Sequence, residues 1–280
     1  MITNGAIRFS ILDPTGNITA LVESPVPVEA QPETAAELMR CHPDVEQVGF
    51  VRFAEEPDAL VHAELRMAGG EFCGNASICA SALYLLNTGT DRTGTPADVR
   101  LSVSGAEQLV NVRLCQEADG EFSACLVYPP ALSITAQLFS FGGFSEKLPI
   151  VFMSGISHII IRPGSVFFTL KEDWNAAEQA LRTWCAGLSA AGLGLMFLEP
   201  EGTEYRLTPY VWVPGAGTFF RENSCASGSA AAAMVLAAES GEKTLVTLHE
   251  PGGCLKVSRD PASGETLLYN RVRLTARFDD

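Results

Sequence analysis

Two segments of the chain place a cysteine directly before a run of small residues. The first reads CGNASICASA from Cys73, and the second reads CASGSAAAAM from Cys225. Each cysteine is expected at the start of a helix, where unpaired backbone N–H groups carry about half a positive charge. That position favours a thiolate, and the same N–H groups can hold a carboxylate. The two segments therefore predict two reactive thiols, each beside a carboxylate site.

Two thiols on opposite sides of a carboxylate suit one reaction, the inversion of the adjacent carbon. One thiolate removes the α-proton while the opposing thiol donates a proton, and the roles exchange in the reverse direction. The helix N-termini would stabilise the negative charge that develops toward the carboxylate. Because the α-proton of an amino acid is weakly acidic, water must be excluded, which a cleft between two domains could do. The residues thus predict an amino-acid racemase or epimerase.

The elements that must position the two cysteines follow a repeated plan. The chain has 280 residues, which at about 150 residues per domain suggests two domains. The cysteines lie 225 − 73 = 152 residues apart, as duplication of one domain would leave them. Small residues also suit any tightly packed helix, so the likeness has a second explanation. Pro129-Pro130 is the best candidate for a linker, giving domains at 1–130 and 131–265.

Each half has the order strands, small-residue helix, strands. The helix that follows Cys225 is expected over 226–239. Two further helices are expected at 32–41 and 174–190. Short β-branched or alternating runs predict strands at 6–11, 19–23, 46–53, 59–67, 99–103, 109–115, 122–128, 148–152, 158–162, 166–170, 195–198, 205–213, 244–249, 255–259 and 266–278.

Composition limits the class of function. Acidic residues outnumber basic ones by 33 − 19 = 14, so nucleic acid and an anionic membrane are unfavourable partners. Hydrophobic residues make up 47% of the chain, which supports a buried core. The first residues do not read as a signal peptide, and the apolar runs are too short to span a bilayer. A soluble, cytoplasmic protein is expected.

The remaining cysteines and histidines do not predict a metal site. The eight cysteines contain no CxxC pair, and the four histidines are scattered. Most of the cysteines are expected to be small buried apolar residues. We expect no metal and no cofactor.

The two cysteine segments resemble motifs of a known family. GGEFCGNAS at 69–77 and ENSCASGSAA at 222–231 resemble the cysteine motifs of the diaminopimelate epimerase-like superfamily of cofactor-independent amino-acid racemases. The resemblance covers nearly the whole chain. It implies an α/β (α+β) fold of two pseudo-symmetric domains, each a β-sheet wrapped around a central helix, with the last strand, about 266–280, joining the first domain. Further matching segments, in the same order, are Gly16-Asn17, Glu46-Gln47 and SGISH at 154–158.

The resemblance also implies roles for individual residues. Cys73 and Cys225 would be the two catalytic acid–base groups. An amino-acid substrate would be bound by Asn17, Gln47, Gly74, Asn75, Ala226 and Ser227. The roles of Glu46, Glu222 and His158 stay open; the histidine could equally be a structural residue at a strand end.

The residues that hold the distal end of diaminopimelate do not match. Ile156 stands at a family asparagine, and Pro214-Gly215-Ala216 replaces the family's ERG segment. A charged distal group would be left unpaired, which is costly. EQVGF, GGEFCGN and ENSCASGS most resemble the histidine racemases of this superfamily, which implies conversion of L- to D-histidine.

Other functions remain open at this point. Diaminopimelate epimerase, or a racemase of another amino acid, would use the same cysteines. A non-catalytic amino-acid-binding protein could use them as a redox-sensitive pair. A homodimer is the default expectation for a soluble protein of this kind.

Overall fold

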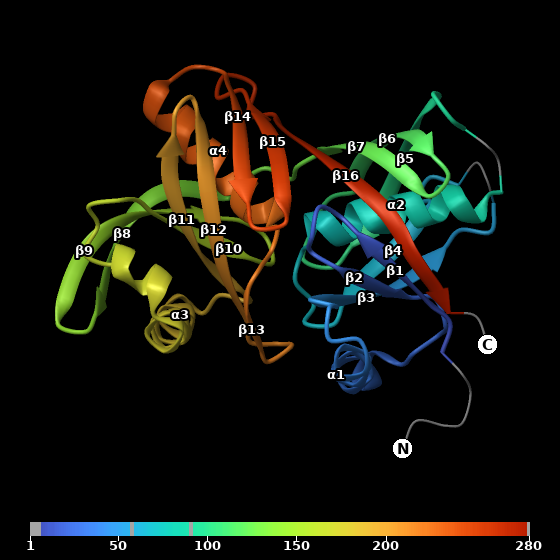
Figure 1. The fold of residues 1–280 in the computed structure, drawn as a ribbon, viewed down its shortest axis with the longest axis horizontal. Helices are drawn as coiled ribbons and strands as arrows, with labels where there is room; N and C mark the ends of the chain where they lie inside the picture. Colours follow the sequence, from blue (N-terminus) through green and yellow to red (C-terminus); the bar gives the residue numbers. More distant parts are fainter. Residues whose placement is uncertain (1–6, 57–58, 90–91, 279–280) are drawn as a thin grey trace. The chain divides into compact units, whose positions relative to one another are not determined.

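The computed structural model describes residues 7–56, 59–89 and 92–278. The fold is mixed α/β. Contacts divide the chain into two compact units. Unit 1 comprises Met1–Leu126 and Tyr269–Asp280, and unit 2 comprises Val127–Leu268. The last segment of the chain is therefore part of unit 1 (Figure 1).

Unit 1 is built on a closed barrel of eight strands. The strands follow each other in chain order from β1 to β7, then β16, and β16 pairs antiparallel with β1 to close the ring. Closure leaves no strand edge unpaired, and alternate side chains point inward, as in the buried–exposed pattern of β4. The strands are β1 (Phe9–Asp13), β2 (Thr19–Val22), β3 (Gln47–Phe53), β4 (Ala63–Met67), β5 (Pro96–Val103), β6 (Val110–Ala118), β7 (Glu121–Val127) and β16 (Thr266–Phe278).

Helix α2 (Gly74–Asn87) is buried along most of its length. Residues 74–85 are all buried, and the helix contacts strands β2 to β6 (Figure 1). Small side chains let the surrounding strands approach the helix on all sides. The hydroxyls of Ser77 and Ser81 donate to carbonyls one turn earlier, at 2.7 and 2.8 Å, so these buried polar groups are satisfied.

A second helix of unit 1 packs against β3. The 3₁₀ helix η1 (Val28–Ala30) leads into α1 (Gln31–Cys41), which has a proline in its first turn as the sequence predicts. Ala35 of α1 joins a core cluster with Val48 and Phe50 of β3. Apolar residues on one helix face thus account for this contact.

Unit 2 is a mixed sheet in which two pairs of strands are parallel, and the chain between the two strands of each pair includes a helix. The order is β15-β14-β12-β11-β10-β9-β8, with β13 paired to β12. β11 runs parallel to β10, and β14 runs parallel to β12; α3 and α4 make the connections that parallel pairs need. The elements are β8 (Ser133–Phe141), β9 (Phe144–Phe152), β10 (Ser157–Ile161), η2 (Phe168–Glu172), α3 (Trp174–Leu188), β11 (Leu193–Glu201), β12 (Glu204–Val213), β13 (Thr218–Arg221), α4 (Ala226–Ser240), β14 (Thr244–Glu250) and β15 (Gly253–Arg259).

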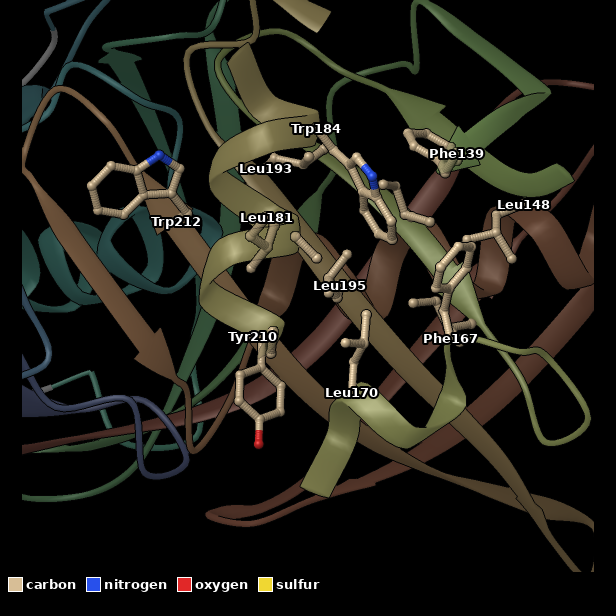
Figure 2. Close-up of a cluster of buried hydrophobic side chains, with 14 of the residues drawn as sticks. Phe139, Leu148, Phe167, Leu170, Leu181, Trp184, Leu193, Leu195, Tyr210 and Trp212 are labelled. Atoms are coloured by element: carbon tan, nitrogen blue, oxygen red, sulfur yellow. The ribbon is translucent and has the colours of Figure 1, made fainter. Parts of the chain in front are cut away.

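The two helices of unit 2 differ in the side chains that they bury. Helix α3 presents large side chains to β11, as Figure 2 shows for Leu181 and Leu195. The Trp184 ring lies 5.1 Å from the rings of Phe139 and Phe167. Helix α4 instead buries alanines, serines and Gly228, and it contacts β9, β10, β11, β14 and β15. Small residues again permit close packing on several sides.

Some of the expected elements differ from those of the structure. The strand expected at 166–170 is wrong, because this segment forms a turn and the start of η2. Phe167 and Leu170 are both buried and three residues apart, which matches the period of a 3₁₀ helix. Strands β8 and β13 were not expected. The first residue of the strand expected at 6–11 lies outside the described residues.

Membrane insertion by a helix finds no support in the described part of the chain. None of the helices within residues 7–56, 59–89 and 92–278 is both long and apolar enough to cross a bilayer.

Candidate active site

Cys73 lies at the N-terminal end of the buried helix α2. Its backbone is extended, and the helix begins at the next residue. Its Sγ accepts a hydrogen bond from the backbone N–H of Ala76 at 3.4 Å. The thiol also lies 3.0 Å from Oε1 of Gln47, to which it can donate. Gly74 and Asn75 form the first turn of α2, so their N–H groups are among those without a helical partner.

Gln47 is held in the orientation that presents its oxygen to Cys73. Its Nε2 donates to the hydroxyl of Thr19 at 2.7 Å, and that hydroxyl donates to the carbonyl of Asn17 at 2.9 Å. Thr19 is fully buried. Since the amide nitrogen is engaged by Thr19, the amide oxygen is the atom that faces the thiol.

A chain of buried amides runs beside this thiol and ends on a carboxylate. Asn270 Nδ2 donates to Asn75 Oδ1, and Asn75 Nδ2 donates to Asn17 Oδ1, each at 3.0 Å. Asn17 Nδ2 then donates to Glu46 Oε2 at 2.6 Å. At the other end, the hydroxyl of Thr15 donates to Asn270 Oδ1 at 2.5 Å. The three asparagines are at most 6% exposed, so every link replaces a hydrogen bond to water.

Sequence reasoning named part of this network and missed the rest. Asn17, Gln47 and Asn75 were candidates, whereas Thr15, Thr19 and Asn270 were not. Asn270 could have been found from the alternation of buried and exposed residues along β16. Leu268 and Val272, two residues before and after it, are both buried, so Asn270 also points inward. A polar residue at an inward position of a strand needs a buried partner.

Glu71, two residues before Cys73, carries a buried carboxyl oxygen. Its Oε2 has no hydrogen-bond partner among the described residues. Burial raises the pKa of this carboxyl, while its backbone hydrogen bonds and the charge of Arg66 act in the opposite direction. The group is thus biased toward its neutral form close to the thiol-bearing segment.

Cys225 occupies the corresponding place at the start of α4 in unit 2. Its Sγ accepts from the N–H of Gly228 at 3.4 Å and lies 3.5 Å from the hydroxyl of Ser227. Its backbone N–H donates to Oε2 of Glu250 at 2.5 Å, and the hydroxyl of Ser229 donates to the other oxygen. Ala226 and Ser227 form the first turn of α4.

The surroundings of Cys225 favour the thiol and not the thiolate. Burial raises the pKa of Cys225 well above its usual value, and the charges of Glu222 and Glu250 raise it further. This corrects the expectation that a helix start favours the thiolate here. Burial, with Glu222 adding to it, also raises the pKa of Glu250 to about 8. This buried thiol beside two carboxyl groups is therefore protonated in its resting state.

Close packing joins this helix start to His158 on β10. A Cβ on Gly228 would lie 2.1 Å from Sδ of Met196, and a Cβ on Gly194 would lie 2.4 Å from Nδ1 of His158. His158 is fully buried, and neither ring nitrogen has a hydrogen-bond partner among the described residues. Burial lowers the pKa of His158 to about 3, so the imidazole is neutral at physiological pH.

His158 and Glu250, two of the buried titratable groups, predict a bounded pH range of maximal stability. His158 loses its contribution as pH falls from 6.5 toward 3, because only the unfolded state then takes up the proton. Glu250 loses its contribution as pH rises from 4.5 toward 8, because only the unfolded state then releases one. Each group changes the free energy of unfolding by about 1.4 kcal/mol per pH unit within its range.

Urea unfolding at a series of pH values would measure this dependence. Between pH 4.5 and 6.5 the two contributions oppose each other, and stability should be nearly constant. Glu250→Gln keeps a neutral side chain that can bond Cys225 and Ser229, so it should reduce the loss of stability between pH 6.5 and 8. It should also replace the plateau between pH 4.5 and 6.5 with a loss of stability toward acid, because the His158 contribution is then no longer opposed. An unaltered alkaline slope in this variant would contradict the assignment to Glu250.

Comparisons with known proteins identify the family of this chain. A protein-family model described as the histidine racemase CntK N-terminal domain matches residues 6–275. A histidine racemase from Fusobacterium nucleatum subsp. nucleatum is 28% identical over 233 residues, which cover 80% of this chain and 78% of that protein. A histidine racemase from Staphylococcus aureus is 27% identical over 257 residues, which cover 90% of this chain and 88% of that protein.

A solved structure shares the fold. It is described as a probable proline racemase from Agrobacterium radiobacter with bound carbonate, and it aligns with a TM-score of 0.72 at 17% identity. The alignment covers 98% of this chain and 93% of that chain.

Proposed function

The chain belongs to the family of the histidine racemase CntK N-terminal domain, and we propose that it interconverts L- and D-histidine with Cys73 and Cys225 as the two acid–base groups. One observation carries the mechanism: each cysteine begins a buried helix, with its Sγ accepting a backbone N–H of the first turn. The reaction would need no cofactor, because both proton transfers are made by side chains of this chain.

The substrate carboxylate would be bound by backbone N–H groups at the two helix starts. On α2 these are the N–H groups of Gly74, which has no side chain, and of Asn75, whose side chain is bonded to Asn17 and Asn270. Those of Ala226 and Ser227 on α4 belong to the first turn of that helix and would bind the carboxylate in the same way. As negative charge develops on the α-carbon and its carboxylate, these dipoles would stabilise it more strongly than they stabilise the ground state.

The different surroundings of the two thiols suggest a direction for the first half-reaction. Cys225 is protonated at rest and would donate the proton to the α-carbon. Cys73 would act as the base in its thiolate form, and once it has taken the substrate proton it would donate its S–H to Gln47 through the 3.0 Å contact. In the reverse direction Cys225 would take back the proton that it gave, and Cys73 would return its own. The mechanism requires each thiol to reach a different face of the same carbon.

The choice of histidine rests on family membership and on the lack of a partner for a charged distal group. Ile156, at the position of a family asparagine, is a buried apolar residue in this structure. A carboxylate and an ammonium group at the distal end of diaminopimelate would meet an apolar side chain there, whereas an uncharged imidazole would lose less on desolvation.

The finer organisation of the molecule is part of the same proposal. We infer two pseudo-symmetric domains, 1–130 with the strand at about 266–280, and 131–265, each a sheet around a central helix. The support is that α2 and α4 both begin at a cysteine and are both buried. A cytoplasmic homodimer is the corresponding proposal for location and assembly.

Proton exchange in heavy water tests the reaction and its substrate together. The reduced protein would be incubated with each of the twenty common L-amino acids and with diaminopimelate, without added cofactor. NMR should show loss of the α-proton signal for histidine, and chiral chromatography should show D-histidine. Exchange with another amino acid alone would overturn the substrate, and histidine binding without exchange would favour a binding protein.

A further inference from the structure

A cysteine, a histidine and a glutamate form a hydrogen-bonded row on the outer face of unit 2. Cys254 lies on β15, His249 on β14 and Glu204 at the start of β12. The Sγ of Cys254 lies 3.1 Å from Nδ1 of His249, and Nε2 of that ring contacts Oε2 of Glu204. Cys254 is exposed, and the side chains of His249 and Glu204 are 42% and 43% exposed. None of the three takes part in the proposed racemisation.

The hydrogen bonds of the His249 ring leave the nitrogen that faces the thiol free to accept a proton. The contact with His249 lowers the pKa of Glu204, so this carboxylate is ionised and can only accept. A neutral His249 therefore carries its proton on Nε2, and the lone pair of Nδ1 faces Cys254. The S–H of Cys254 can donate to that lone pair.

The backbone fixes this geometry. His249 and Cys254 are directly opposed in the antiparallel pairing of β14 with β15, so their side chains lie on the same face of the sheet. β14 also pairs with β12, the strand that carries Glu204. The sulfur and the imidazole therefore stay in contact without ordering a mobile segment.

We propose that Cys254 is a thiol–disulfide exchange site that forms mixed disulfides with small, water-soluble disulfides, with His249 as the base. The thiol proton passes to Nδ1 of His249, and the thiolate sulfur attacks one sulfur of the incoming disulfide. A new S–S bond forms at Cys254 while the original S–S bond breaks. The departing thiolate takes up the proton from His249, so the products are the mixed disulfide and one free small thiol.

The site needs a base because its thiol is protonated at rest, although the sulfur is strongly nucleophilic once deprotonated. Partial burial, together with the charge of Glu204, raises the pKa of the Cys254 thiol. A higher pKa gives a better nucleophile but leaves less thiolate, and an adjacent base compensates for the second effect. Among the described residues, no three histidine, cysteine, aspartate or glutamate side chains are arranged so that they could hold a metal ion. The geometry of Cys254, His249 and Glu204 therefore disfavours metal binding.

The chain supplies a matched control in Cys41, a second exposed thiol. Its Sγ lies 3.6 Å from a carboxylate oxygen of Glu37 and 3.6 Å from the guanidinium of Arg40. The adjacent His42 packs its ring edge-on against Phe9 and Phe278. Cys41 thus shares the exposure of Cys254 and has an ion pair beside it in place of an imidazole.

Oxidised glutathione is the probe for the test. The full-length reduced protein would be incubated with it, and peptide mass spectrometry would give the rate of mixed-disulfide formation at Cys254 and Cys41. At pH 7 Cys254 should react about tenfold faster than Cys41, a modest gain for an exposed general base. Equal rates at the two cysteines would overturn the proposal.

Two variants distinguish the effect of His249 as a base from the effect of solvent exposure on the rate at Cys254. His249→Asn should reduce the rate at Cys254 to about that of Cys41, and between pH 7 and 8 its rate should then rise about tenfold, in proportion to the thiolate. The unaltered protein should show a flatter pH profile. Glu204→Gln keeps the imidazole and should give an intermediate rate. Rates at Cys254 that neither variant changes would overturn the role of His249, and the Cys41 rate shows whether either variant has disturbed the fold.

Discussion

Replacing Cys73 or Cys225 with serine should lower the rate of histidine racemisation by about 10³-fold or more, because each substitution removes one of the two acid–base groups. A serine hydroxyl has nearly the size of the thiol but is a far weaker acid, so the fold should be retained while proton transfer fails. Chiral chromatography of product formed from L-histidine and, separately, from D-histidine measures the loss.

Isotope exchange gives a sharper result than the loss of racemisation alone. Each variant keeps the cysteine that serves one enantiomer, so it should still exchange the α-proton of that enantiomer with heavy water without inverting it. The two variants should retain exchange on opposite enantiomers. Cys41→Ser, at an exposed cysteine, is the control and should racemise histidine normally. Substantial racemisation by Cys73→Ser or Cys225→Ser would contradict the two-base mechanism.

Gly105→Ala should destabilise the protein by about 3 kcal/mol, because it adds an overlap with backbone atoms to an unfavourable backbone conformation. Gly105 has φ +72°, and a Cβ there would lie 2.4 Å from the backbone nitrogen of Phe72. Backbone atoms cannot rotate away as a side chain can. Because Phe72 directly precedes Cys73, the displacement should reach the thiol and reduce activity as well. Urea unfolding and racemisation rates measure the two effects.

Gly120→Ala is the matched control for this substitution. Gly120 has the same φ of +72°, but its Cβ would lie 3.5 Å from the nearest atom, Cβ of Leu274, which is an ordinary contact. The control therefore carries the conformational strain alone, about 1 kcal/mol. The difference between the two variants isolates the overlap with Phe72. Equal destabilisation would show that the close approach at Gly105 relaxes at little cost.

The helix starts at the two cysteines could be predicted because their signal is local. A cysteine followed by small residues is visible within ten residues of sequence, and both α2 and α4 begin at the residue after it. The same holds for α1, whose proline lies in its first turn. The strand expected at 166–170 failed because Phe167 and Leu170 fit a strand and a 3₁₀ turn about equally well by composition.

The features that the sequence could not supply depend on distant partners. Asn270 contacts Asn75, a residue 195 positions earlier, so its role becomes visible only when β16 is placed in the barrel. The raised pKa of Cys225 likewise depends on Glu250, which lies 25 positions later. Local sequence predicts that a cysteine lies at the positive end of a helix, but burial and neighbouring carboxyl groups determine the direction in which its pKa shifts.

The pairing of β1 with β16 has a consequence for protein synthesis. The first strand of unit 1 emerges from the ribosome long before its partner, because the whole of unit 2 is translated in between. Until β16 arrives, β1 and β7 each keep an open edge, and Asn75 lacks the amide of Asn270. Open edges invite pairing with other chains. The nascent protein is therefore expected to be most prone to aggregation, and most dependent on chaperones, after unit 2 has been synthesised and before β16 leaves the ribosome.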